Sequence, residues 1–101
     1  MIKIIGTGRL TKDVEVKELE KSNILSFTLA SGKDDEVQFM ECNYLVSKDS
    51  KISQYLVKGT LISFAGNYFT EKWETKEGNK ASRVVCRIEE LSLESAQKKA
   101  E

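Results

Sequence analysis

Phe69 and Trp73 are two aromatic residues four positions apart, in a segment that also contains basic residues. In a β-strand, residues separated by an even number point to the same face, so a strand here would put both rings on one surface. Flat apolar rings stack on nucleobases of any sequence, because every base has a π-face, and nearby cations pair with phosphates. The two rings are therefore candidates for binding an unpaired nucleic-acid strand.

Basic residues lie near these rings in the sequence, and a third aromatic residue, Phe39, points outward from another candidate strand. The candidate phosphate contacts are Arg9, Lys12, Lys33, Lys72, Lys76, Lys80, Arg83 and Arg87. Alternation puts Arg83 and Arg87 on one face of a strand, and two cations on one face of a barrel strand suggest a binding role. The competing interpretation is that single lysines are ordinary solvated surface, and that Phe39 and Phe69 lie in a subunit interface.

Enzymatic and metal-dependent chemistry have little support in the composition. The chain has no histidine, which removes the commonest general base and the commonest metal ligand. Cys42 and Cys86 do not form a C-x-x-C pair, so we expect two buried, reduced thiols rather than a zinc site. Residues 6–8, Gly-Thr-Gly, are too short for a phosphate-binding loop. We therefore expect no catalytic residue, no metal and no cofactor.

The size and charge of the chain fit one globular domain. Its 101 residues suffice for a single core, and a composition with 40% hydrophobic and 32% charged residues is typical of a folded domain. Sixteen basic and sixteen acidic residues cancel, so a phosphate-binding surface requires the cations to gather on one face. No apolar run approaches the roughly 20 residues that cross a bilayer, and no secretory segment begins the chain. These features favour a cytoplasmic protein without a membrane partner.

The hydrophobic pattern predicts five strands and one short helix. The expected strands cover residues 2–10, 24–30, 37–46, 60–73 and 81–93, with polar turns at 31–36 and 75–80. Val14 and Val16 extend the first strand beyond its glycines. Between the third and fourth strands, Asp49 or Ser50 can cap a helix of about two turns that ends before Gly59.

This order of elements predicts an all-β fold. Three strands, a helix and two strands are the connectivity of an OB-fold, a small and mostly closed barrel that presents one face to ligands. We therefore expect a five-stranded OB-fold barrel with one short α-helix between strands 3 and 4, formed by residues 1–93. A short polar tail is expected at 94–101. An SH3-like barrel or a small open sheet is the alternative.

Alternation along the expected strands also predicts which residues fill the barrel. The aromatic residues expected in the core are Phe27, Tyr55, Phe64 and Tyr68. Gly6 and Gly8 interrupt the first strand, which suggests a bulge or a sharp bend there.

Several segments resemble the bacterial and phage single-stranded DNA-binding protein family, and together they cover nearly the whole chain. The segments are residues 5–13 (IGTGRLTKD), 25–30 (LSFTLA), 55–59 (YLVKG) and 66–73 (GNYFTEKW). The resemblance implies an OB-fold that holds single-stranded DNA for replication, recombination or repair, without catalysis. It also implies that Phe39 and Trp73 occupy positions at which the family stacks bases, and that the chain forms a homo-oligomer, a tetramer or a dimer.

The chain departs from the family pattern in three places. Leu45 stands where the family usually has another stacking aromatic, unless the register shifts by one residue and Tyr44 faces the ligand. The loop at 32–36 lacks the tryptophan often found there, which implies fewer stacked bases. Residues 95–101 lack the acidic, hydrophobic-ended motif that recruits replication and recombination proteins in the family. Such partners are therefore not carried over, and the chain resembles a short phage-encoded form, which would act in the host cytoplasm.

Three classes of function stay open from the residues alone. Sequence-tolerant binding of single-stranded DNA leads. An RNA-binding OB module is the second, because stacking does not distinguish DNA from RNA unless the 2′-OH is contacted. A protein-interaction barrel that lost nucleic-acid binding is the third, favoured by the neutral net charge and by the outward-facing Glu41, Glu71 and Glu74.

Overall fold

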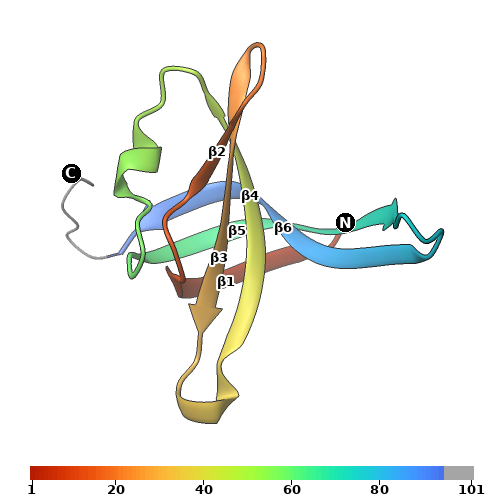
Figure 1. The fold of residues 1–101 in the computed structure, drawn as a ribbon. Coiled ribbons are helices and arrows are strands. Elements are labelled where there is room, and N and C mark those ends of the chain that lie inside the picture. The colour runs from red at the N-terminus through yellow and green to blue at the C-terminus, as the bar shows by residue number, and fades with distance from the viewer. Residues whose placement is uncertain (95–101) are drawn as a thin grey trace.

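The structure is a computed structural model that describes residues 1–94, so the tail expected at 94–101 lies outside the described residues after Glu94. Six strands and two short 3-10 turns make up the fold (Figure 1). In chain order the elements are β1 (Lys3–Leu10), β2 (Glu15–Glu18), β3 (Ser22–Ser31), η1 (Asp34–Glu36), β4 (Gln38–Ser47), η2 (Ile52–Tyr55), β5 (Leu61–Glu74) and β6 (Lys80–Leu93). Within the described part of the chain, no helix has both the length and the apolar character needed to span a bilayer.

The strands form one sheet that closes on itself. The sheet order is β1-β5-β6-β4-β3-β2, and β1 also pairs with β3 through Arg9 and Leu10. All pairings are antiparallel except that of β4 with β6. β1 and β2 are two parts of one interrupted strand, because β2 continues along β3 after the short break at residues 11–14. The ring therefore has five strands, and the predicted all-β OB-fold barrel is confirmed.

The segment between β4 and β5 is shorter than the two-turn helix predicted for it. It forms a single 3-10 turn, Ile52–Tyr55, in which Lys51 precedes the first residue and makes no capping bond with its side chain. Ser50 Oγ, one of the two predicted caps, accepts a hydrogen bond from Ile52 N–H at 3.4 Å. The chain has little room for a second turn, because Ser50 N–H already donates to Ser47 carbonyl in a turn after β4. At the other end, Leu56 carbonyl accepts a hydrogen bond from Val14 N–H, which ties the segment back to the barrel wall. Anchoring at both ends outweighs the helical spacing of the apolar residues.

The core lies inside the ring and follows the predicted alternation. Leu25, Phe27 and Leu29 of β3 are buried, and Ile62 and Phe64 of β5 meet them from the opposite wall. Thus the core placements of Phe27 and Phe64 are confirmed. Burying apolar side chains in this way supplies the main favourable free energy of folding.

The two cysteines lie in the same core, as the sequence predicts. Cys42 and Cys86 are free, buried thiols that face each other in the β4–β6 register. Burial raises the pKa of both thiols above the ordinary value, since a thiolate would be poorly solvated there. Both groups therefore stay protonated at neutral pH.

Three expectations about single residues differ from the structure. Tyr55, on the turn that covers one end of the barrel, is only partly buried and is not part of the core cluster. Tyr68 is not a core residue, because 43% of it is exposed where β5 extends beyond the barrel. Gly6 and Gly8 do not form a bulge; β1 is continuous from Lys3 to Leu10. Gly8 is needed for close approach instead, since a Cβ there would lie 2.9 Å from the carbonyl oxygen of Ala30.

Two hairpins extend beyond the barrel in different directions (Figure 1). One is formed by β3 and β4, and its connection contains η1. The other is formed by β5 and β6, which remain paired from Glu74 and Lys80 at the turn down to Ile62 and Leu93. The β5–β6 hairpin carries both aromatic residues of the 69–73 segment, so its register decides what surrounds them.

Candidate nucleic-acid interface

The register of β4, β6 and β5 builds one outer surface from alternate residues of each strand. On β5 and β6 the opposing pairs are Phe69 with Val85, and Glu71 with Arg83. On β4, Glu41 lies beside Val85. Paired residues in a sheet point to the same face, so these side chains share the surface opposite the barrel core. We call this surface the outer face.

Phe69 and Arg87 form the first aromatic–cation pair on the outer face. The guanidinium carbon of Arg87 lies 3.4 Å from the centroid of the Phe69 ring. At this distance the planar guanidinium is stacked on the ring and covers one of its sides. Sequence alternation correctly predicts that both residues face outward, but it gives no sign that one covers the other.

Trp73 and Arg83 form the second aromatic–cation pair, farther along the β5–β6 hairpin. The guanidinium carbon of Arg83 lies 5.9 Å from the indole centroid, at the outer limit of a cation–π contact. Trp73 is 47% exposed and stays outside the core, as predicted. Its ring is thus the more open of the two.

Arg83 is also held by two carboxylates. Its Nε donates to Oε1 of Glu71 at 2.8 Å, and its Nη1 lies 3.1 Å from Oε2 of Glu41. The hydrogen bond to Glu71 raises the pKa of Arg83 above its ordinary value. Glu41 and Glu71 are recognisable from the sequence as outward-facing acids, but their convergence on one arginine depends on a cross-strand register that the sequence does not reveal.

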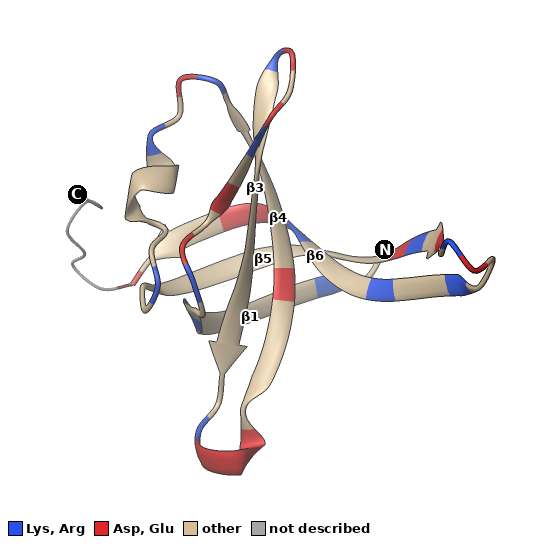
Figure 2. Cartoon of the chain, viewed as in Figure 1, with Lys and Arg blue, Asp and Glu red and all other residues tan. Residues whose placement is uncertain are grey.

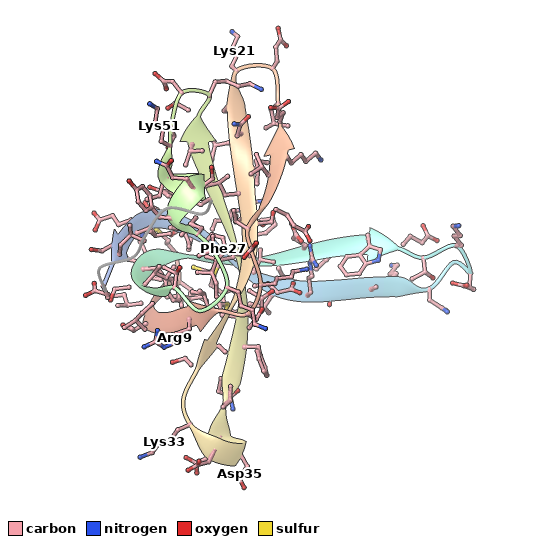
Figure 3. The ribbon with its side chains drawn as sticks, turned by 60° about the vertical axis from the view of Figure 1, so that its left-hand side comes forward. Arg9, Lys21, Phe27, Lys33, Asp35 and Lys51 are labelled. Carbon is pink, nitrogen blue, oxygen red and sulfur yellow. The ribbon has the colours of Figure 1, made fainter. Side chains whose placement is uncertain are left out.

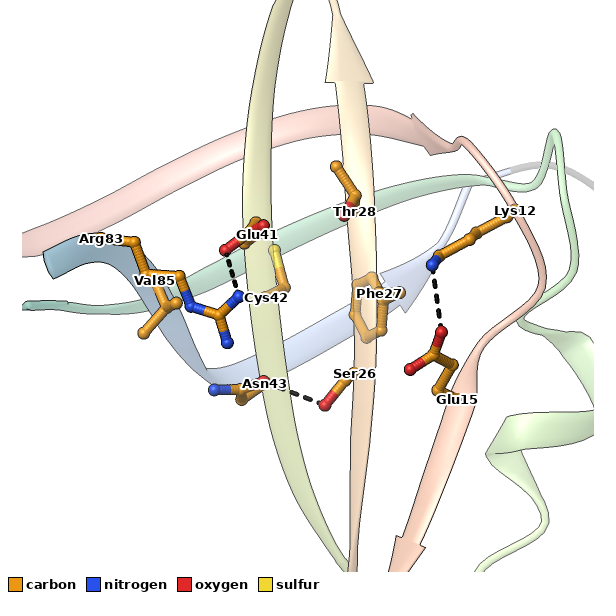
Figure 4. A pocket seen from close by; sticks show the side chains of 10 residues that line it. All are labelled: Lys12, Glu15, Ser26, Phe27, Thr28, Glu41, Cys42, Asn43, Arg83 and Val85. Atoms are coloured by element: carbon orange, nitrogen blue, oxygen red, sulfur yellow. Dashed lines mark hydrogen bonds and ion pairs between the residues drawn. The ribbon is translucent and has the colours of Figure 1, made fainter. Parts of the chain in front are cut away.

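A hollow in the outer face is open between β3, β4 and β6 (Figure 4). The lining residues are Lys12, Glu15, Ser26, Phe27, Thr28, Glu41, Cys42, Asn43, Arg83 and Val85. Ser26 Oγ lies 3.1 Å from Oδ1 of Asn43, and Lys12 Nζ lies 3.0 Å from Oε1 of Glu15. Lys12 is therefore brought to the edge of the outer face, whereas Ser26 and Asn43 are polar lining residues that sequence reasoning missed.

The register also decides between Tyr44 and Leu45. Leu45 is 61% exposed and lines a second hollow with Ile24, Asn43 and Arg87. Tyr44 lies opposite the fully buried Leu25 and packs against the core. The outward-facing position on β4 is thus occupied by an aliphatic side chain, and Tyr44 does not face outward in its place.

Phe39 lies on the outer surface near the start of β4, and Arg9 of β1 lies two strands away from it. Phe39 is 66% exposed, and Ala30 of β3 separates it from Arg9 of β1 in the register. Arg9 donates from Nη1 to the carbonyl oxygen of Gly59 at 2.9 Å. Phe39 thus shares a strand face with Glu41 but stands apart from the aromatic–cation pairs.

The remaining candidate lysines are spread over the two hairpins (Figure 2). Lys72 and Lys80 pair with Ser82 and Glu74, which places them on the side of the β5–β6 hairpin opposite Trp73. Lys76 lies in the turn of that hairpin. Lys33 lies at the tip of the β3–β4 hairpin, beside an acidic turn (Figure 3). The structure therefore gathers Arg83 and Arg87 on the outer face and places Lys12 at its edge, but it does not gather Arg9 or the other candidate lysines there.

The described residues contain no group of three or more His, Cys, Asp or Glu side chains arranged to hold a metal ion. Aromatic rings, guanidinium groups and hydrogen-bonding side chains are what the outer face offers. Such groups can stack on flat ligands and pair with anions.

Comparison with known proteins finds similar sequences that are described as single-stranded DNA-binding proteins. The chain is 34% identical over 85 residues to a single-stranded DNA-binding protein of Clostridium perfringens, covering 79% of this chain and 57% of that protein. It is 31% identical over 101 residues to one of Wolinella succinogenes, covering 90% of this chain and 62% of that protein. The chain thus spans less than two thirds of the length of these two relatives.

A solved structure shares the fold. It is described as a Plasmodium falciparum SSB complex with ssDNA, and it superposes with a TM-score of 0.81 at 18% identity, covering 94% of this chain and 96% of that one. A family model described as the single-strand binding protein family matches residues 1–94, which include all six strands. On this match, the chain belongs to the single-strand binding protein family.

Proposed function

We propose that this protein binds single-stranded DNA without reading its sequence, and protects it during replication, recombination or repair. The observation that carries the proposal is the outer face, on which Trp73 and Phe69 each lie beside an arginine. The names of the family and of its relatives agree with this function, and they describe binding proteins rather than enzymes. The proposed role implies the cytoplasm, where bacterial and phage DNA is found.

Binding would combine stacking with phosphate contacts. Trp73 offers an open indole to a base, and the guanidinium of Arg87 can stack on a base above Phe69. Phe39 would extend the platform along β4. The proposed phosphate contacts are Arg9, Lys12, Lys33, Lys72, Lys76, Lys80 and Arg87. Arg83, which the sequence also predicts as a contact, is already paired with Glu41 and Glu71. The lysines flank the outer face rather than covering it, so the backbone would run along its margins.

Tryptophan fluorescence gives a direct test, because Trp73 is the only tryptophan in the chain. Titration with oligo-dT should quench this fluorescence, and the affinity should fall as salt rises, with a log–log slope of about −0.7 per phosphate neutralised. Duplex DNA of equal length should bind far more weakly, because its bases are unavailable for stacking. No binding of oligo-dT at low salt would refute the proposed function.

The same titration separates the other two classes of function. Tighter binding of oligo-U than of oligo-dT would indicate an RNA-binding module, since only RNA offers the 2′-OH. Failure to bind any of the three nucleic acids, with the fold intact by circular dichroism, would indicate a protein-interaction barrel.

We also propose that the chain forms a homo-oligomer through the surface of β1 and β5 on the other side of the barrel. Ile5 is 83% exposed there. It lies opposite Ala65, and its neighbours Thr7 and Ser63 form the next pair. A large aliphatic side chain on a strip of small residues is suited to burial against a second copy.

Replacing Ile5 with lysine should lower the molar mass in solution to that of a monomer, because it would put an uncompensated charge in the interface. Size-exclusion chromatography with light scattering measures this mass. Val16→Lys is the control, as Val16 is an exposed aliphatic residue on β2. A monomeric wild-type protein, or an Ile5→Lys variant of unchanged mass, would contradict the proposed interface.

A further inference from the structure

The outer face has a negatively charged centre. Glu41 of β4 and Glu71 of β5 both pair with Arg83 of β6, at 3.1 Å and 2.8 Å. We call these three residues the carboxylate–arginine cluster. With two carboxylates and one guanidinium, the cluster carries one net negative charge. That sign is opposite to what a polyanionic ligand requires.

The position of the cluster makes this charge important. Glu71 lies between Phe69 and Trp73 on the same face of β5, and Arg83 belongs to the second aromatic–cation pair. A DNA strand stacked on both rings must pass over the cluster. Its bases or its phosphates must therefore lie against two carboxylates.

The two ways of crossing differ strongly in electrostatic energy. A phosphate placed here would face both carboxylates within a few ångströms, where salt screens poorly because the Debye length is about 8 Å at physiological ionic strength. Arg83 would compensate only in part, because its Nε and Nη1 are already directed at Glu71 and Glu41 and its single positive charge faces two negative ones. A base, by contrast, can donate ring or amino N–H groups to a carboxylate. The cluster thus tolerates bases and repels phosphates.

We propose that the carboxylate–arginine cluster excludes phosphates from the centre of the outer face and thereby restrains the affinity for single-stranded DNA. This inference rests on the proposed function and deepens it. Arg83 lies beside the Trp73 ring, and its positive charge is neutralised by Glu41 and Glu71 rather than by DNA. The strand is then guided with its bases inward over the cluster and its backbone along the margins.

The double substitution Glu41→Gln/Glu71→Gln tests this directly. It removes the repulsion and frees Arg83, so affinity for oligo-dT at low salt should rise about three- to tenfold. The salt dependence should become steeper by about 0.7 in log–log slope, because Arg83 can then neutralise one phosphate. Partly exposed ion pairs contribute little to stability, so the variant should fold normally.

The matched control removes the same two charges elsewhere. Glu18 and Glu20 lie at the β2–β3 turn and are exposed, and neither forms a side-chain ion pair within residues 1–94. Glu18→Gln/Glu20→Gln should raise affinity less than the cluster variant and leave the slope unchanged. Equal gains in the two double variants, or a loss of affinity in the cluster variant, would overturn the inference while leaving the proposed function intact.

A triple variant identifies the cation. Adding Arg83→Gln to the cluster variant should abolish the steeper salt slope, whereas a slope that stays steep would show that Arg83 is not the group released. If the wild-type protein and all variants fail to bind oligo-dT, the proposed function itself is refuted, and this inference with it.

Discussion

Replacing Trp73 with alanine weakens oligo-dT binding by about 1–3 kcal/mol, a loss of roughly 5- to 150-fold in affinity, because one stacking surface is removed. Trp73 is the ring with the largest expected effect, since the Phe69 ring is already covered on one side by Arg87. The fold should survive, as Trp73 is half exposed on the hairpin and lies outside the core. Fluorescence anisotropy of a labelled oligonucleotide measures the change.

Tyr68→Ala is the matched control for this substitution. Tyr68 is a similarly exposed aromatic residue, but its register position places it on the opposite face of β5. Removing it should change affinity by less than removing Trp73. Comparable losses in the two variants would mean that binding does not depend on the outer face, and unchanged affinity in a folded Trp73→Ala protein would remove the main site assignment.

Much of this fold can be predicted from the sequence because its strands alternate cleanly. In β3 every second residue from Leu25 to Leu29 is apolar, and all three are buried. The same alternation puts Phe69, Trp73, Arg83 and Arg87 outward. Period-two patterning is strong wherever one face of a strand meets the core, since a slip of one residue would exchange the faces.

The errors arise where an element leaves the barrel or is tied at both ends. Tyr68 keeps the inward parity of Phe64, but the barrel ends before it and the side chain is exposed. The segment at 52–55 keeps helical spacing, yet hydrogen bonds on both sides limit it to one turn. Alternation states which face a residue belongs to, but not how far the opposing wall extends.

Which side chains pair on the outer face could not be predicted from the sequence, for a different reason. Arg83 is separated from Glu41 by 42 positions and meets it only because β4 and β6 pair in parallel. A shift of two residues in that register would keep every residue on the same face and still replace the partner of Arg83. The local sequence determines which face of a strand a residue occupies. Which residue of another strand it contacts depends on how the barrel closes.

That closure depends on Gly66, and substituting alanine there should strongly destabilise the protein. A Cβ at Gly66 would lie 2.4 Å from the carbonyl oxygen of Arg87 and 2.7 Å from the Sγ of Cys86. Neither neighbour can move easily, because one is backbone of β6 and the other is a fully buried side chain. We expect Gly66→Ala to lower the free energy of unfolding by about 2–4 kcal/mol, as for other overpacked sites.

Thermal unfolding followed by circular dichroism measures this loss, with Gly78→Ala as the comparison. Gly78 has a φ of +83° in the β5–β6 turn, and a Cβ there meets nothing closer than 3.9 Å. Its substitution should cost only the backbone conformational penalty, about 1–2 kcal/mol. If Gly66→Ala unfolds at the same temperature as the Gly78→Ala variant or above it, the close approach at Gly66 does not limit the fold.

The expected cost at Gly66 also connects stability with the outer face. The β5–β6 register shifts between Ala65 and Gly66, so β6 has one extra residue at the base of the hairpin. Beyond this shift, Arg87 lies opposite Asn67 and its guanidinium reaches the Phe69 ring. A side chain at Gly66 would push β6 away at the residue that carries this arginine. The absence of a side chain at one position thus allows the core to close and sets the spacing of the first aromatic–cation pair.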